Sequence, residues 1–315
     1  MLFRSLFLLI VWGVADLIEP HRSTWRFAAV AAPVIIAALA ATAYIQTSYW
    51  RNSETLWTHA LAVTSNNDFA HNNLGYLCVD SGKLDEAISH FEAAAMIRHD
   101  KTNKHYNVGS AFVEMNLADS LARKGESDQA MVHYQEAIRL EPNYADAYYN
   151  RGNLLLAKGD VDDAIADWEK TLLLQPNDAD AHTCLGNALL RKGSINEAIG
   201  HYETALALAP EDPHSRNNLA WILATSSDDK VRDGAKAVEF AQQAVVLSGG
   251  RDPKFIRTLA AAYAESGRFS DSIAAAQQAT MIANMQGKRQ LANNLEKDLL
   301  LYRASLPLRA NSSGN

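Results

Sequence analysis

One segment of this chain recurs at a fixed spacing, and that spacing limits the chain to very few folds. Residues 144–177, YADAYYNRGNLLLAKGDVDDAIADWEKTLLLQPN, have the pattern of one helix, a tight turn, a second helix and a stop at a proline. Five landmark residues each have a counterpart 34 residues later: Gly152 and Gly186, Gly159 and Gly193, Ala164 and Ala198, Trp168 and Tyr202, Pro176 and Pro210. Self-similarity at this period is typical of helical solenoids, in which each repeat packs on its neighbours.

The repeated residues indicate how the two helices pack. We number the positions of each repeat so that Gly152 is position 8, and we name the first helix A and the second helix B. A glycine inside a helix costs about 1 kcal/mol against alanine, so its place at position 8 indicates a close approach of helices A and B. The large ring of Trp168 fills the gap between repeats, and Pro176 ends helix B.

These residues carry a family resemblance. A small residue at position 8, Gly at 15, Ala at 20, an aromatic residue at 24, Ala at 27 and Pro at 32 resemble the tetratricopeptide repeat, and the pattern recurs along most of the chain. The resemblance implies an all-α fold, a right-handed α-solenoid of about six helix-turn-helix repeats. An ordinary helical bundle with accidental spacing is the alternative.

Two apolar stretches precede the repeats. Residues 27–45 contain no charge and are long enough to span a bilayer, which takes about 20 residues. The earlier stretch, residues 5–18, is shorter, and it reads either as a signal peptide or as the first helix of a hairpin whose loop is 19–26. We therefore expect an N-terminal transmembrane helix or hairpin, and we favour the hairpin.

The charges beside these stretches predict an orientation. Arg22 and Arg26 lie between the two stretches, whereas Arg4 precedes them and Arg51 follows them. Positive loops stay in the cytoplasm, so this arrangement places the repeats on the periplasmic or extracytoplasmic side of the membrane.

The expected organisation has five parts. They are a membrane segment (1–48), a capping half-repeat (49–67), the solenoid (68–286), a C-terminal capping helix (287–304) and a disordered tail (305–315). A short interfacial linker anchored by Trp50 and Trp57 is the alternative for the second part. The spacing slips between the first and second repeats, which predicts a lengthened helix from about Asn103 to Lys124, and about six extra residues lie around Ser226 to Gly234.

Composition and motifs exclude several functions. The net charge of -7 argues against a nucleic-acid partner. The two cysteines, Cys78 and Cys184, belong to distant repeats and cannot form a disulfide framework. The ten histidines form no pair at the ligand spacing of one helix, so no metal site is expected. No phosphate loop or nucleophile motif is found; we expect no catalytic residues, no enzyme activity and no cofactor.

Asparagines form the one constellation that points to binding. Position 6 of helix A faces the concave side in this fold, and an amide there can pair with an extended peptide backbone. This arrangement resembles the asparagine ladder of O-GlcNAc transferase, and it predicts a peptide-binding groove whose side chains face solvent. The candidate residues at positions 6 and 9 are Asn73, Asn116, Asn150, Asn153, Asn187 and Asn218. The carboxylate clamp of chaperone-binding repeats requires lysine at position 5, where this chain has Tyr149 and Thr183.

A second resemblance covers nearly the whole chain. The runs WGVADLIEP, SYWRNSETLWTHALAVTSNNDFAHNNLG, NNLAWILATSSD and LYRASLP are similar to the C-terminal part of bacterial membrane glycosyltransferases that carry such repeats, and of protein O-mannosyltransferases. The many-helix catalytic region of that family is absent from the sequence, so we expect no sugar transfer by this chain alone. Whether residue 1 is a native start stays open.

Two functions follow from these observations. The first is a membrane-anchored scaffold that binds a protein or peptide partner in its concave groove. The second is the substrate-presenting tail of a truncated or split membrane glycosyltransferase, whose catalytic part is a separate partner chain.

Overall fold

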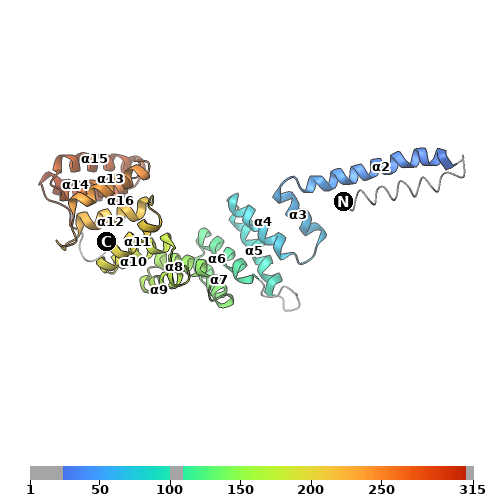
Figure 1. Cartoon of the computed structure of the whole chain (residues 1–315), viewed down its shortest axis with the longest axis horizontal. Helices are drawn as coiled ribbons and strands as arrows, with labels where there is room; N and C mark the ends of the chain where they lie inside the picture. Colours follow the sequence, from blue (N-terminus) through green and yellow to red (C-terminus); the bar gives the residue numbers. More distant parts are fainter. Residues whose placement is uncertain (1–23, 100–108, 310–315) are drawn as a thin grey trace. The chain divides into compact units, whose positions relative to one another are not determined.

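The computed structural model describes residues 24–99 and 109–309, with side chains in the first helix described from Pro33 onward. The first apolar stretch, residues 5–18, lies outside the described residues. Every regular element in the described ranges is a helix (Figure 1). The chain divides into two compact units, residues 1–106 and 107–315, and each is described by itself.

The described part of the first unit contains four helices. They are α2 (Thr24–Tyr49), α3 (Ser53–Val63), α4 (Asp68–Asp80) and α5 (Leu84–His99). The pair α4 and α5 is a complete repeat, with Phe91 of α5 buried against Gly75 of α4. The short helix α3 packs on α4, and its Trp57 ring lies 6.1 Å from the Phe69 ring.

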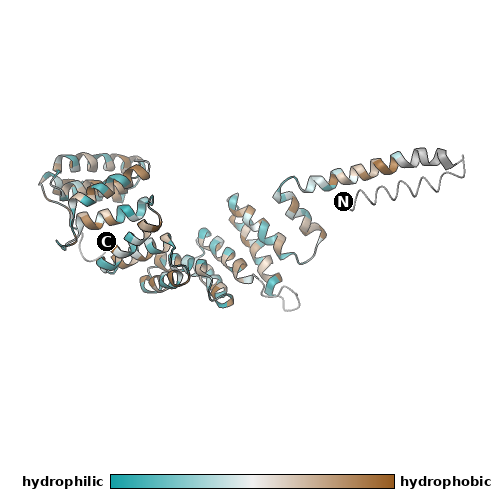
Figure 2. Cartoon of the chain, viewed as in Figure 1, coloured by the Kyte–Doolittle hydropathy of each residue, from teal (hydrophilic) through white to brown (hydrophobic). Residues whose placement is uncertain are grey.

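Helix α2 has an apolar surface with little cover. The side chains of Val34, Ile35, Ile36 and Leu39 are each more than half exposed, and Figure 2 shows the apolar residues along this helix. In the part of the chain that the structure describes, no helix meets the combined length and apolarity required to cross a bilayer.

The second unit contains five further helix pairs and a final helix. They are α6 (Ser110–Lys124), α7 (Ser127–Leu140), α8 (Ala145–Lys158), α9 (Val161–Leu174), α10 (Ala179–Arg191), α11 (Ile195–Leu208), α12 (Pro213–Thr225), α13 (Gly234–Leu247), α14 (Pro253–Glu265), α15 (Phe269–Met285) and α16 (Arg289–Arg303). Within this unit the helices stack in chain order (Figure 1). The described part of the second unit is therefore an α-solenoid of five helix pairs and a final helix.

The contact between positions 8 and 24 sets the distance between the helices of a pair. Trp168 and Tyr202 are fully buried, and each ring lies against a glycine. A Cβ atom at Gly152 would lie 2.9 Å from Trp168 Nε1, and one at Gly186 would lie 2.8 Å from Tyr202 Cε1. Neither distance is tolerated by packed atoms, so these two glycines are required by the close approach that the sequence predicts.

The last helix covers the end of the solenoid. Leu295 and Tyr302 of α16 are buried in a cluster with α14 and α15. Arg257 of α14 donates from Nε to Asp298 Oδ2 of α16 at 2.6 Å, and the Asp298 side chain is buried. A solenoid needs such a cover because its terminal repeat otherwise exposes an apolar face.

Two local expectations differ from the structure. The lengthened helix from Asn103 to Lys124 is wrong in its described part, because Gly109 adopts a left-handed φ of 66° and α6 begins only at Ser110. The tail was expected to be disordered from residue 305, but Leu308 packs on the α14–α16 cluster and Arg309 contacts Glu265. Residues 310–315 lie outside the described ranges.

The glycine contacts generate a paired test within one repeat. Gly186→Ala forces a methyl group into the Tyr202 ring and should lower the free energy of unfolding by roughly 1–3 kcal/mol. Gly200→Ala on the exposed surface of α11 meets nothing within 4 Å and should raise it by up to about 1 kcal/mol. Denaturant unfolding of both variants measures the difference; equal effects at the two positions would contradict the packing role of Gly186.

Candidate binding groove and the polar links between repeats

Side chains at positions 6 and 9 connect successive A helices. Asn150 Nδ2 of α8 donates to Asp119 Oδ1 of α6 at 3.1 Å. Asn218 Nδ2 of α12 donates to Asn187 Oδ1 of α10 at 2.7 Å. Both pairs join position 6 of one repeat to position 9 of the repeat before it. The amides expected to bind a ligand are thus also used to hold neighbouring repeats together.

The aromatic residue at position 24 adds a second donor to each link. Tyr134 OH donates to Asp119 Oδ1 at 2.5 Å, and Tyr202 OH donates to Asn187 Oδ1 at 2.7 Å. Each acceptor at position 9 therefore receives one hydrogen bond from its own repeat and one from the next. Burial raises the pKa of both phenols, so the hydroxyl groups stay protonated as donors at neutral pH.

The middle link of this series is weaker. Repeat three has Trp168 in place of a tyrosine, and its buried Nε1 has no hydrogen-bond partner among the described residues. At position 6 of the next repeat, Cys184 Sγ donates to Asn153 Oδ1 at 3.7 Å, and Tyr149 OH lies 3.7 Å from the same sulfur. Burial raises the pKa of the Cys184 thiol, so this residue is a weak neutral donor.

The six asparagines that were predicted to bind a ligand have different environments in the structure. Asn116 is buried at 5% exposure, so the expectation that its side chain faces solvent is wrong. Asn73 donates to the Phe69 carbonyl of its own helix at 2.7 Å. Asn187 and Asn218 line a cavity, and the adjacent Asn217, which the sequence reasoning missed, lines it as well. The sequence offers one indication of a role for Asn217, because it is at position 5, directly before the predicted asparagine at position 6.

That cavity lies along four successive A helices, α8, α10, α12 and α14. Its volume is about 370 Å3. The lining residues are Tyr149, Asp180, Thr183, Cys184, Asn187, Asp212, His214, Asn217, Asn218, Asp252, Lys254 and Phe255. We name this cavity with its lining residues the A-helix groove.

The A-helix groove is rich in hydrogen-bond acceptors. Three carboxylates, Asp180, Asp212 and Asp252, face a single ammonium group, Lys254. Asn217 Oδ1 is buried and finds no hydrogen-bond partner in the described part of the chain. A buried acceptor of this kind costs about 1–3 kcal/mol until a donor reaches it. The groove therefore suits a ligand that brings N–H groups and positive charge.

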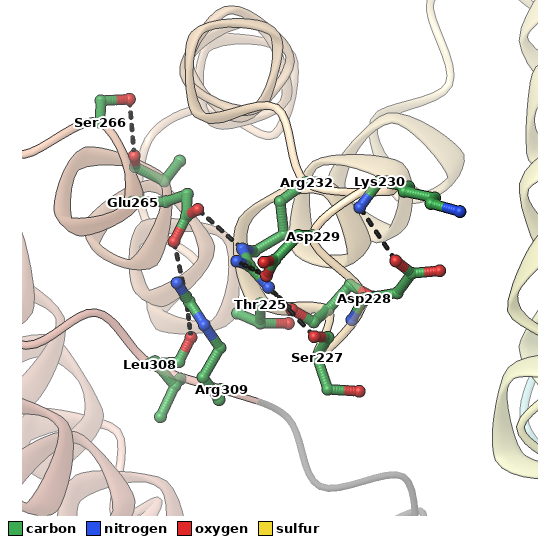
Figure 3. A network of polar contacts seen from close by, with 12 residues as sticks. Thr225, Ser227, Asp228, Asp229, Lys230, Arg232, Glu265, Ser266, Leu308 and Arg309 are labelled. Atoms are coloured by element: carbon green, nitrogen blue, oxygen red, sulfur yellow. Dashed lines mark hydrogen bonds and ion pairs between the residues drawn. The ribbon is translucent and has the colours of Figure 1, made fainter.

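The insertion between α12 and α13 is held in one conformation by an arginine (Figure 3). Arg232 Nη1 donates to the Ser226 carbonyl at 2.8 Å, and its Nε donates to Glu265 Oε1 at 2.9 Å. Arg232 also pairs with Asp229, and Arg309 Nη1 reaches the second oxygen of Glu265 at 2.5 Å. The six extra residues are thus a fixed corner that connects α12, α14 and the C-terminal segment.

In the described residues no group of three or more His, Cys, Asp or Glu side chains is placed to hold a metal ion.

The buried, hydrogen-bonded Asp119 gives a prediction about thermal stability, and the size of the predicted effect depends on pH. Burial raises the pKa of Asp119 above 3.8, while hydrogen bonds from Tyr134 and Asn150 offset part of the shift. A raised folded pKa means that the protonated carboxyl favours folding and that this contribution is lost as pH rises through the folded pKa. Asp119→Asn keeps an acceptor, as Asn187 does in repeat four, without the buried charge.

We expect Asp119→Asn to raise Tm by about 2–4 °C at pH 7, which corresponds to about 1 kcal/mol. The gain should shrink toward zero at about pH 4 as Asp119 becomes protonated in the parent protein. Thermal unfolding monitored by circular dichroism at both pH values measures it. A variant that is less stable at pH 7 would show that the charged hydrogen bonds outweigh the desolvation of Asp119.

Comparison with known proteins agrees with this architecture. A family model described as TPR repeat matches residues 118–159 and 152–193, and models described as Tetratricopeptide repeat match residues 179–212 and 70–100. Protein O-mannosyl-transferase Tmtc3 from Drosophila melanogaster is 24% identical over 160 residues, which are 47% of this chain and 17% of the relative. The chain spans less than a fifth of the length of the curated relatives that it matches.

Solved structures share the fold. The APC/C hetero-tetramer Cut9–Hcn1 matches with a TM-score of 0.60 and 20% identity, over 79% of this chain and 46% of that chain. A tetratricopeptide repeat protein from Parabacteroides merdae matches with a TM-score of 0.55 and 17% identity, over 77% of this chain and 98% of that chain. Residues 70–100 and 118–212 of this chain are thus tetratricopeptide repeats.

Proposed function

We propose that this chain is a scaffold that binds an extended segment of a partner protein in the A-helix groove. The observation that carries the proposal is the buried Asn217 Oδ1, which has no partner among the described residues and lies in a groove lined by acceptors. An extended peptide brings backbone N–H donors at regular intervals. The excess of carboxylates over the one lysine favours a segment that also carries basic side chains.

We further propose that the N-terminal segment attaches the chain to a membrane, with the repeats on the extracytoplasmic side. The support is the uncharged run of residues 27–45 and the two arginines that precede it, Arg22 and Arg26. Helix α2 places the described part of this run in one helix, and its apolar side chains have little cover.

A second candidate function is supported by the likeness to a Protein O-mannosyl-transferase over 47% of this chain. In this proposal the solenoid presents a substrate segment to a membrane glycosyltransferase that is a separate chain. Both proposals use the A-helix groove for the same task, the capture of an extended segment, and neither requires catalysis by this chain.

The groove proposal is tested by removing the acceptor that has no partner. Partners of the full chain are first identified by cross-linking and affinity purification, and the binding segment is made as a peptide. Asn217→Ala should weaken binding of that peptide about 2- to 12-fold, because one hydrogen bond contributes about 0.5–1.5 kcal/mol. The variant should fold normally, since Asn217 Oδ1 accepts nothing in the described structure and the bond lost from its Nδ2, to the adjacent Asn218 Oδ1, is long at 3.4 Å.

Asn73→Ala is the matched control, since Asn73 lies on α4 and bonds within its own helix. Its affinity for the peptide should equal that of the parent. Normal binding by Asn217→Ala, measured by calorimetry, would exclude the A-helix groove as the binding surface.

The membrane proposal predicts where the repeats are accessible. The chain should stay in the membrane fraction after alkaline carbonate extraction, because apolar helices resist removal from lipid. Protease added to intact spheroplasts should digest the repeats, and deletion of residues 1–48 should release the chain into the soluble fraction. Repeats that are protected in intact spheroplasts would contradict the proposed orientation.

A further inference from the structure

Two repeats place a pair of histidines face to face between helix A and helix B. His182 Nδ1 of α10 lies 2.9 Å from His201 Nδ1 of α11. His71 Nδ1 of α4 lies 3.1 Å from His90 Nδ1 of α5. Both pairs occupy positions 4 and 23 of their repeats, 19 residues apart. The sequence reasoning considered spacing along one helix and therefore missed pairs that form across two.

The proton arrangement of the second pair follows from its neighbours. His182 Nε2 lies 3.2 Å from the Pro176 carbonyl oxygen. A carbonyl only accepts, so Nε2 carries the proton and the neutral ring turns its Nδ1 lone pair toward His201. Histidines that bind metal ions characteristically donate their other ring N–H to a carbonyl or carboxylate in this way. His182 is thus held in the tautomer of a metal ligand.

We propose that the pairs His182–His201 and His71–His90 are each a two-imidazole site for a divalent transition-metal ion such as Zn2+, Cu2+ or Ni2+. Imidazole nitrogens suit these ions. Metal–nitrogen bonds of about 2.0–2.1 Å at a tetrahedral angle separate two nitrogens by roughly 3.3 Å. A small rotation of either ring opens the observed separations to that value. The ion takes the place of the proton shared by the two Nδ1 atoms, and that proton moves to the other nitrogen of its ring or is released to solvent.

The surroundings favour the neutral, metal-binding form of the rings. Burial, and then the neighbouring His182, lower the pKa of His201, while Glu197 and Glu169 act in the opposite direction. Burial likewise lowers the pKa of His90, and Glu86 opposes the shift. Neutral imidazoles need little deprotonation to bind a metal at neutral pH. The negative charge of these glutamates favours the binding of a divalent cation.

Two protein ligands make a site at which the ion exchanges. No third His, Cys, Asp or Glu in the described ranges completes either pair, so water fills the remaining positions. An ion held by both rings clamps helix A to helix B in that repeat. In repeat four the clamp acts beside the A-helix groove, because Thr183 and Cys184, which follow His182 directly, line it.

Repeat two offers a comparison within the chain. Its positions 4 and 23 are Glu114 and His133, and Glu114 Oε2 lies 2.6 Å from His133 Nδ1. The same geometry there joins a carboxylate oxygen, which accepts, to an imidazole nitrogen, which can donate. Two imidazoles do not form such a complementary pair, and a metal ion can bridge their two nitrogen atoms.

The test is titration of the full chain, purified in detergent and stripped with a chelator, with Zn2+ in competition with a chromophoric chelator. We expect two ions per chain. The double variant His182→Gln with His201→Gln should lose one site, as should His71→Gln with His90→Gln, each with at least a tenfold loss of affinity at that site. His59→Gln, which removes a histidine whose ring stacks on Tyr49 and which lies outside the A-helix groove, is the matched control and should keep both sites.

A spectroscopic readout separates the proposal from general loss of structure. Cu2+ added to the parent chain should give an electron paramagnetic resonance spectrum with hyperfine splitting from two imidazole nitrogens. Circular dichroism in chelator should show that the double variants keep their helices. Unchanged stoichiometry in both double variants, the absence of saturable binding by the parent chain, or a spectrum without two nitrogen ligands would overturn the proposal.

Discussion

The contact of an aromatic ring with a glycine between helices A and B fixes the helix spacing in three of the described repeats, and the packing of those repeats depends on it. Phe91, Trp168 and Tyr202 are buried, and the glycine opposite each ring leaves no room for even one added carbon. The ring therefore fixes how closely the two helices of a repeat approach. Because a solenoid is built by neighbour contacts, a distance fixed in one repeat also sets the surface offered to the next.

The polar links follow from that placement. The hydroxyl group of a tyrosine at position 24 reaches position 9 of its own helix A, whether position 8 is Gly186 or Ala118, and position 9 also accepts from position 6 of the next repeat. Asp119 and Asn187 each receive both bonds. A link of this kind requires the hydroxyl group of a tyrosine at position 24. Trp168 fills the same space but does not supply that donor, and its own Nε1 has no partner in the described structure.

These dependences show what the sequence can and cannot reveal. The period, the helix pairs and the role of Gly152 are visible because they depend on residues within one repeat. Contacts between repeats, such as Asn218 with Asn187, depend on how the superhelix is wound, so the sequence placed the amides at one surface but missed their bonds to each other. The burial of Asn116 was missed for the same reason. The face-to-face histidines lie within one repeat, and they were missed because only spacing along a single helix was considered. The start of α6 was misplaced because the spacing was extended through Gly109.

The position of the A-helix groove follows from where the repeat pattern is broken. Where two donors meet one acceptor, the polar groups satisfy each other and offer little to a ligand. At Cys184 a thiol stands in place of the asparagine, and its contacts with Tyr149 and Asn153 are long. Two repeats later the pattern changes again, because position 6 of α14 is Thr258, which bonds within its own helix. The interval between these two departures contains Asn217, whose Oδ1 has no partner in the described structure, and the three carboxylates of the lining.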